Sequence, residues 1–244
     1  QLESTLQMNG PMIVIAGAGS GKTRVLTYKI AYLMTQGVDP FNILALTFTN
    51  KAAREMKERI ANIVGDEAKN LWMGTFHSVF ARILRIEAHK IGYTSNFTIY
   101  DSDDSQKLVA RIIKELNLDK EQYKYKIIFS RISSMKNNFI SADQYVNDEE
   151  MLLSDKISNR PKFHQIYKQY VDRCFKAGAM DFDDLLLKTN ELLNSYPDTL
   201  SKYQNIFRYI LVDEYQDTNH SQYLIIRSLS DKFQNICAVS YTHL

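Results

Sequence analysis

An apolar run that leads directly into a glycine-rich turn constrains the fold of this chain more than any other feature. Met12–Ala16 reads as a buried strand, and the small residues after it end in Lys22 and Thr23. From Lys22 onward, apolar residues recur at helical spacing. Small residues in such a turn let successive backbone N–H groups converge on a phosphate chain, and the helix adds its positive end. The pattern predicts an α/β domain with a phosphate-binding loop.

The turn matches the Walker A pattern, with Ala16 in the place of the first glycine. Lys22 is expected to reach the β- and γ-phosphates of a nucleotide as a point charge, and the Thr23 hydroxyl is expected to ligate Mg²⁺. A glycine-rich turn without a ligand is the alternative, which the strand before the turn and the helix after it disfavour. The residues predicted to hold the phosphates are Ala16, Gly17, Ala18, Gly19, Ser20, Gly21, Lys22 and Thr23.

Short apolar runs alternate with amphipathic stretches over the first hundred residues, and similar runs return near the end of the chain. Such runs are apolar throughout, as in strands that are buried on both faces, and this alternation favours a parallel sheet flanked by helices. The runs predicted as strands cover residues 12–16, 43–48, 71–76, 209–213 and 236–239.

Between these two groups of strands the sequence has a different pattern. Helical periodicity appears over residues 102–117, 122–136 and 161–177, and nothing in that span has the pattern of a core strand. We therefore predict a helical subdomain over residues 101–178. It would be inserted into a sheet domain formed by residues 1–100 and 179–239.

A pair of carboxylates follows the fourth predicted strand. The run Ile210-Leu211-Val212 ends in Asp213 and Glu214, and ligands of open α/β sheets gather at the carboxyl ends of strands. Asp213 is expected to hold Mg²⁺, directly or through water, and Glu214 to orient and deprotonate an attacking water. An acidic loop that caps a strand is the alternative, and the phosphate loop upstream disfavours it.

Composition excludes several classes of protein. Hydrophobic residues make up 45% of the chain and charged residues 24%, which is ordinary for a globular protein. The net charge of +2 does not indicate a polyanion partner, so such a site must come from local arrangement. No apolar run approaches the ~18 residues of a membrane span. Cys174 and Cys237 cannot form a disulfide framework, so the cytoplasm is the expected compartment.

Taken in order, the motifs resemble those of superfamily 1 DNA helicases of the UvrD/Rep/PcrA type. The resemblance extends over residues 1–239. It rests on Ala16–Thr23 with Arg24, Thr47-Phe48-Thr49-Asn50-Lys51-Ala52-Ala53, Gly74-Thr75-Phe76-His77-Ser78, Asp181-Phe182-Asp183-Asp184-Leu185-Leu186, and Asp213-Glu214-Tyr215-Gln216-Asp217-Thr218-Asn219.

The resemblance implies a RecA-like motor domain that uses ATP and Mg²⁺ and translocates 3′ to 5′ on single-stranded DNA, with single-strand/duplex junctions as further partners. It places Arg24 in the nucleotide site. It also aligns Gln1 with the glutamine that reads adenine in the family.

The residues after the second and third strands are expected to contact DNA. Phe48 offers an aromatic face on which a base can stack, independently of sequence. The short polar groups nearby suit phosphate and sugar contacts. A core aromatic and a structural histidine are the alternatives for Phe48 and His77. The predicted DNA-contacting residues are Thr47, Phe48, Thr49, Asn50, Thr75 and His77.

The end of the sequence departs from the family. After Val239 the family continues with a motif whose glutamine senses the γ-phosphate, whereas this chain reads Ser-Tyr-Thr-His-Leu over residues 240–244. We expect these five residues to be a non-native tail. The second RecA-like domain and its arginines are not in this sequence, so we expect the fragment alone to be inactive as an ATPase.

Two other functions stay open at this point, and two segments are ambiguous. The chain could belong to a helicase subunit of a recombination helicase–nuclease, or act as a nucleotide-dependent DNA-binding module without turnover.

Asp181–Asp184 is predicted to cap a helix rather than to bind a metal. The tyrosines and lysines of residues 123–136 could contact duplex DNA or form an ordinary amphipathic helix.

Overall fold

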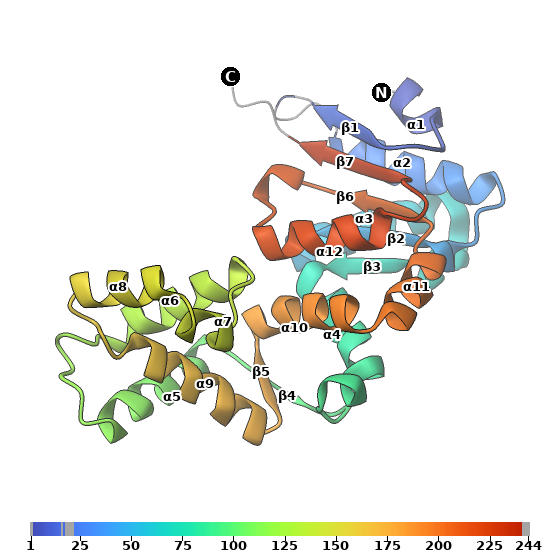
Figure 1. The fold of residues 1–244 in the computed structure, drawn as a ribbon. Helices are drawn as coiled ribbons and strands as arrows, with labels where there is room; N and C mark the ends of the chain where they lie inside the picture. The colour runs from blue at the N-terminus through green and yellow to red at the C-terminus, as the bar shows by residue number, and fades with distance from the viewer. Residues whose placement is uncertain (1, 16, 18–21, 241–244) are drawn as a thin grey trace. The chain divides into compact units, whose positions relative to one another are not determined.

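The computed structural model describes residues 2–15, 17 and 22–240. The chain divides into two compact units (Figure 1). The first comprises Gln1–Arg82 and Asn190–Leu244, and the second is Ile83–Thr189. Each unit has its own group of buried apolar residues, so each is described by itself.

The first unit is built on a five-stranded parallel sheet, as the sequence predicts. Its strands lie in the order β1-β7-β6-β2-β3. The first strand of the chain therefore pairs with the last, and Met12 is opposite Cys237. The bounds are β1 Met12–Ile15, β2 Ile43–Thr47, β3 Trp72–Thr75, β6 Tyr209–Val212 and β7 Ile236–Ser240.

Helices α2 and α3 supply much of the core of this unit. Leu26, Ile30 and Leu33 of α2 are at most 1% exposed, and Met56 and Ile60 of α3 are equally buried. They pack in one cluster with apolar residues of β2, β6 and β7. The helices of this unit are α1 Leu2–Leu6, α2 Lys22–Thr35, α3 Asn50–Val64, α11 Pro197–Ile206 and α12 His220–Ser230, with short 3₁₀ turns at Pro40–Asn42, Gly65–Asn70 and Tyr215–Asp217.

The second unit is mostly helical. Tyr145, Phe163, Tyr167 and Tyr170 are at most 1% exposed and form the centre of its core. Two short strands pair in parallel beside the helices. Its elements are the 3₁₀ turn Ala88–Ile91, β4 Thr98–Tyr100, α5 Ser102–Glu115, α6 Tyr125–Asn137, α7 Ala142–Val146, α8 Glu149–Ile157, α9 Phe163–Lys176 and β5 Ala179–Asp181, while α4 Phe76–Glu87 and α10 Phe182–Ser195 each contribute residues to both units.

Asp181 caps α10, as the sequence predicts, because its Oδ1 accepts a hydrogen bond of 2.7 Å from the backbone N–H of Asp184. The same two carboxylates also hold a buried amine. Lys136 Nζ lies 2.7 Å from Asp181 Oδ2 and 2.8 Å from Asp184 Oδ1. Tyr170 donates a further hydrogen bond of 2.7 Å to Asp181 Oδ2. An amine therefore occupies the position that a metal ion would need.

The three charges shift one another's titration. Burial and then the charge of Asp181 raise the pKa of Asp184 to about 6. Burial also acts to raise the pKa of Asp181, but the charge of Lys136 and its hydrogen bond outweigh burial and hold that pKa below its usual range. Burial opposes the charged amine as well, yet the two carboxylates raise the pKa of Lys136 far above its usual value.

Three further findings concern metals, membranes and the end of the last described strand. Among the described residues, no cluster of three or more His, Cys, Asp and Glu residues could hold a metal ion, and no helix is long and apolar enough to cross a membrane. Strand β7 extends through Ser240, which pairs with Ile15 and lies one residue beyond the predicted strand. Residues 241–244 lie outside the described part.

Candidate functional site

The carboxyl ends of four strands bring the predicted motifs to one edge of the sheet. The parallel order places the ends of β1, β6, β2 and β3 on the same side. Phosphate-loop residues follow β1, the carboxylate pair follows β6, and the two predicted DNA motifs follow β2 and β3. Because β6 lies between β7 and β2, the carboxylates follow a strand that lies between β1, which precedes the phosphate loop in the sequence, and the two strands that lead into the DNA motifs.

The phosphate loop is described only in part. Gly17 has open space on the side where a Cβ would stand. Helix α2 begins at Lys22, so the amino end of a helix follows the loop as predicted. The side chain of Lys22 lies outside the described part. Arg24 is exposed and lines a hollow with Arg59. Of the other predicted nucleotide contacts, Gln1, Ala16, Ala18, Gly19, Ser20 and Gly21 lie outside the described residues.

Thr23 and Asp213 come together although 190 positions separate them. The Thr23 hydroxyl donates a hydrogen bond of 3.3 Å to Asp213 Oδ2. Asp213 is 3% exposed, so its carboxylate is withdrawn from bulk water. A hydroxyl and a carboxylate are the hard oxygen donors that Mg²⁺ prefers, and the separation lets both face one ion. The pair fits the Mg²⁺ site that the sequence predicts.

The backbone around Asp213 fixes this carboxylate in place. The N–H of Asp213 donates a hydrogen bond of 3.0 Å to the carbonyl oxygen of Leu46 in β2. The other carboxylate oxygen, Oδ1, accepts a hydrogen bond of 3.1 Å from the N–H of Glu214. Glu214 adopts φ 49° and ψ 46°, a left-handed conformation that is uncommon for a residue with a side chain. This sharp turn ends β6 and redirects the chain into the 3₁₀ turn Tyr215–Asp217.

Gln216 holds the side chain of Glu214, a contact that the sequence alone does not reveal. Gln216 Nε2 donates a hydrogen bond of 2.7 Å to Glu214 Oε2 and a longer one of 3.3 Å to Asp217 Oδ2. Glu214 is half-buried, so its carboxylate is still within reach of solvent. A carboxylate that is held on one side and open on another is suited to accept a proton from a water molecule.

At the ends of β2 and β3, two aromatic rings pack together. The ring centroids of Phe48 and Phe76 are 5.4 Å apart with an interplanar angle of 49°. Phe76 is 1% exposed, whereas Phe48 is half-buried. The buried Phe76 ring therefore packs against Phe48, which is itself partly exposed.

The polar residues of the first DNA motif differ in how accessible they are. Thr49 and Asn50 are exposed at the start of α3, where Thr49 Oγ1 accepts a hydrogen bond of 3.1 Å from the N–H of Ala52. Thr47, in contrast, is 1% exposed, and its hydroxyl donates a hydrogen bond of 3.2 Å to the carbonyl of Thr49. A contact between Thr47 and DNA would require this turn to open.

The second motif lies directly beside the first, because Thr75 of β3 is opposite Thr47 of β2. Thr75 Oγ1 and Ser78 Oγ are 3.1 Å apart and joined by a hydrogen bond. His77 is half-buried in the first turn of α4. The glycine at position 74 leaves room for this contact, since an added Cβ would stand 2.5 Å from Ser78 Oγ and the serine side chain would have to shift.

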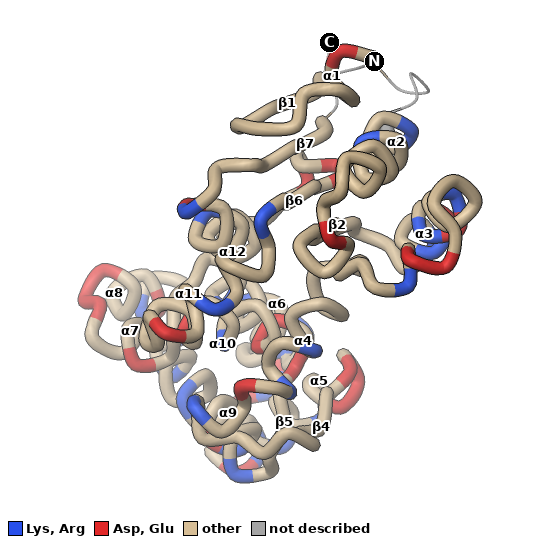
Figure 2. The backbone as a smooth tube through the Cα atoms, turned by 90° about the vertical axis from the view of Figure 1, so that its right-hand side faces the viewer, with Lys and Arg blue, Asp and Glu red and all other residues tan. Residues whose placement is uncertain are grey.

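Charge along α3 is mixed rather than purely basic (Figure 2). Lys51 and Arg59 lie 3.9 Å and 3.7 Å from carboxylate oxygens of Glu55. These are exposed pairs, which attract weakly in water. Helix α3 therefore adds only a modest positive potential to this edge of the sheet.

Comparison with known proteins gives one consistent result. A family model described as UvrD/REP helicase N-terminal domain matches residues 1–240. ATP-dependent DNA helicase PcrA from Staphylococcus epidermidis is 43% identical over 240 residues, which is 98% of this chain and 32% of that protein. PcrA from Staphylococcus aureus has the same identity and coverage. The chain thus spans about a third of the length of these relatives.

Proposed function

Because this chain belongs to the UvrD/REP helicase family, we propose that it is the first motor domain of an ATP-dependent DNA helicase. The observation that carries the proposal is the contact between Thr23 and Asp213, 3.3 Å apart at the carboxyl edge of the parallel sheet. That contact joins the phosphate loop to the carboxylate pair. It gives an oxygen-rich site where a nucleotide and its metal ion can be held together.

The nucleotide site is proposed to form around the end of β1. The backbone of residues 16–21 cradles the phosphates, Lys22 contacts the β- and γ-phosphates, and Gln1 and Arg24 complete the site. Thr23 and Asp213 hold Mg²⁺, whose charge offsets that of the phosphate oxygens. The amino end of α2, which starts at Lys22, adds a positive partial charge.

Hydrolysis needs a group that positions water and accepts its proton. Glu214 is proposed for this role because its carboxylate is half-buried beside the Asp213 carboxylate and is held by Gln216. Gln216 acts as a positioning residue, since it orients Glu214 and leaves the second carboxylate oxygen to face the water. The fixed position of Glu214 lowers the cost of aligning water with the γ-phosphate.

Single-stranded DNA is proposed to bind at the ends of β2 and β3. Phe48 stacks on a base, and the exposed or half-buried groups of Thr49, Asn50, Thr75 and His77 contact phosphate and sugar. Thr47 belongs to this set only if its turn opens. The hydrogen bond from Asp213 to Leu46 supports a direct connection between the nucleotide and the DNA ends of the site.

The remaining proposals concern the whole protein, of which this chain spans about a third of the length of its relatives. A second RecA-like domain would close on the nucleotide and allow 3′ to 5′ movement on a single strand towards single-strand/duplex junctions. Within this chain, residues 101–178 are proposed as an insertion in a motor domain made of residues 1–100 and 179–239. A mostly helical unit inserted into a sheet unit supports a division of this kind, but the second unit is Ile83–Thr189, so it begins 18 residues earlier and ends 11 residues later than the proposed insertion and includes β4 and β5.

ATPase activity of the full-length parent, measured with and without single-stranded DNA, tests the proposal. Lys22→Ala should abolish detectable hydrolysis, because the phosphate charge is then poorly compensated. Glu214→Gln should retain ATP binding and lose turnover, since it keeps the shape and removes the base. Lys107→Ala, at an exposed position on α5, is the control. Parental turnover by Glu214→Gln would show that another group is the base.

The 244-residue chain alone is proposed to bind Mg·ATP weakly and to hydrolyse it negligibly. An arginine on the γ-phosphate contributes ~10³–10⁵ in rate in this chemistry, and the family takes its arginines from a second domain. Without that domain the site is open to water, which weakens its electrostatic contacts. DNA-stimulated turnover near the parental rate would contradict this, and Arg24→Ala would then test whether Arg24 supplies the charge.

A further inference from the structure

We propose that a groove between α5 and α6 binds an acidic, partly apolar peptide segment of a protein partner. The groove lies entirely in the second unit, between residues 110 and 127. None of the residues that line it is a predicted nucleotide or DNA contact of the sheet edge. Its volume is about 850 Å³, which is within the range of sites that bind ligands.

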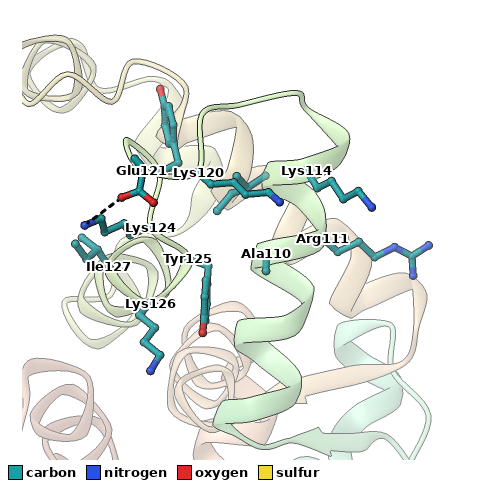
Figure 3. Close-up of a pocket in the computed structure, with 11 residues that line it drawn as sticks. Ala110, Arg111, Lys114, Lys120, Glu121, Lys124, Tyr125, Lys126 and Ile127 are labelled. Carbon is teal, nitrogen blue, oxygen red and sulfur yellow. Dashed lines mark ion pairs between the residues drawn. The ribbon is translucent and has the colours of Figure 1, made fainter.

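Cationic side chains surround the opening (Figure 3). Lys124 lies 3.5 Å from Glu121, the acidic residue that lines the groove, and Arg111 pairs with Glu115 at 2.9 Å. Lys114, Lys120 and Lys126 form no ion pair with any described residue. The cations that line the groove are Arg111, Lys114, Lys120, Lys124 and Lys126. Their excess over Glu121 predicts an anionic occupant.

The walls of the groove are mainly apolar. Ile113 and Tyr123 are buried in its floor, and Ala110 is half-buried beside them. Tyr125 and Ile127 keep 41% and 44% of their surface exposed. Figure 3 shows Tyr125 in the space between the two helices, with cationic side chains to either side. Apolar side chains of a partner would remove this surface from water.

The start of α6 adds a second source of positive potential. Its N-cap is Lys124, which makes no side-chain cap hydrogen bond. The first backbone N–H groups of a helix need acceptors and carry a positive partial charge, and a lysine at this position cannot accept a hydrogen bond. A carboxylate of an incoming peptide would satisfy these donors.

A peptide fits both properties of the groove better than a nucleic acid does. A phosphodiester backbone supplies charge but few apolar groups to fill an apolar hollow. An amphipathic segment with Asp or Glu beside Leu or Phe supplies both, as in the helix-in-groove mode of recognition. The aromatic ring of Tyr125 could also stack on a base. The experiment therefore distinguishes peptide binding from nucleic acid binding.

Binding of fluorescein-labelled peptides to the 244-residue chain, followed by anisotropy, tests the proposal. The first peptide combines Asp and Glu with Leu and Phe. The second keeps the acidic residues and has Ser in place of Leu and Phe. We expect saturable binding of the first peptide and at least roughly tenfold weaker binding of the second, because apolar anchors carry most of the energy at such sites. Equal binding of the two, or no binding of the first, would overturn the proposal.

Groove variants locate the site. Lys114→Glu combined with Lys126→Glu should weaken binding of the first peptide by roughly tenfold or more. Tyr125→Ala should weaken its binding by at least roughly fivefold. Lys107→Glu reverses an exposed charge on α5 outside the groove and should change binding by less than about twofold. An equal loss with Lys107→Glu would overturn the proposal, since it would reveal attraction to net charge alone.

Oligonucleotides provide the last arm of the test. Labelled single-stranded and duplex DNA are titrated into the same variants. If Lys114→Glu combined with Lys126→Glu weakens DNA binding but leaves binding of the first peptide unchanged, the groove binds nucleic acid and the proposal is wrong. Urea unfolding of each variant checks that it folds. If the double variant does not fold, Tyr125→Ala and Ile127→Ser replace it in the binding measurements. Tyr125 and Ile127 are both partly exposed, so these two substitutions should leave the fold intact.

Discussion

The backbone N–H of Asp213 donates a hydrogen bond of 3.0 Å to the carbonyl oxygen of Leu46. Leu46 belongs to β2, and Phe48 follows two residues later. Asp213 also accepts a hydrogen bond of 3.3 Å from the hydroxyl of Thr23. One residue therefore contacts both the start of α2 and the strand that leads to Phe48. We infer that a displacement of Asp213 would be passed directly to the aromatic residue proposed to hold DNA.

Thr23 is the first residue to test at the proposed metal site. Thr23→Ala removes the hydroxyl that lies against Asp213 and should lower the affinity for Mg·ATP by roughly tenfold or more. Thr23→Ser keeps a hydroxyl and should bind nearly as well as the parent. Titration with a fluorescent ATP analogue, with and without Mg²⁺, measures both. Equal affinities of all three proteins in Mg²⁺ would show that Thr23 is not a ligand.

Gln216 should affect turnover without affecting ATP binding. Gln216→Ala removes the 2.7 Å hydrogen bond to Glu214, so the carboxylate samples other orientations. We expect kcat of the full-length parent to fall by roughly tenfold to a hundredfold, with little change in ATP affinity. Asp217→Asn is the matched control, because it alters the other partner of Gln216. Unchanged kcat in Gln216→Ala would contradict the positioning role.

Phe48→Ala should weaken single-strand binding by roughly 1–3 kcal/mol, about equally for all base sequences, because stacking does not depend on base identity. ATP affinity without DNA should hardly change. Phe48→Tyr keeps a ring and serves as control. Fluorescence anisotropy with homopolymer oligonucleotides at one salt concentration measures the effect. Equal DNA affinity in parent and Phe48→Ala would assign Phe48 to packing against Phe76 alone.

Replacement of the buried Lys136 should make the free energy of unfolding depend more strongly on pH. Lys136→Met leaves Asp181 and Asp184 buried without the amine that contacts both. We expect a loss of about 3–5 kcal/mol in the free energy of unfolding near neutral pH. The pKa of Asp184 is already raised to about 6, and both carboxyls would bind protons more tightly in the folded variant than in the unfolded chain.

The sign follows from proton linkage. When the folded state binds protons more tightly, stability rises as pH falls, so the deficit of Lys136→Met should shrink between pH 8 and about pH 5. Urea unfolding across this range measures it, with the exposed Lys107→Met as control. A deficit that stays constant with pH would mean that the carboxylates do not cause it.

The strands of the sheet could be predicted because parallel strands are apolar throughout and stand out in a sequence. The prediction that the first of them is buried was wrong, since β1 lies at the edge of the sheet and Ile13 and Ile15 are 57% and 55% exposed. Strand ends were predicted one residue too late at Phe48, Phe76 and Asp213, which begin turns or helices. Strands β4 and β5 were missed, since three residues show no periodicity and their pairing joins Thr98 to Ala179. The short helices α7 and α8 were missed for a similar reason.

Residues of the candidate site could be predicted only where they belong to a recognisable sequence motif. Thr23 and Asp213 were each assigned to Mg²⁺ from local pattern, and the structure brings them within hydrogen-bonding distance. Gln216 belongs to the motif that runs from Asp213 to Asn219, but the motif does not reveal its contact with Glu214, which forms across the left-handed turn at Glu214. Lys136 belongs to the stretch 123–136 whose lysines could contact duplex DNA, but it is fully buried, and this burial depends on partners 45 and more positions away.

The pairing of β1 with β7 has a consequence for synthesis on the ribosome. Gly10 and Asn235, which flank these strands and share a hydrogen bond, are 225 positions apart. At ~5–20 residues per second, β1 therefore waits roughly 10–45 s for its partner to be translated. Strands β2 and β3 are both made by residue 75 and can pair early. The nascent chain thus carries an unpaired apolar strand, a target for chaperones, until β7 has been translated.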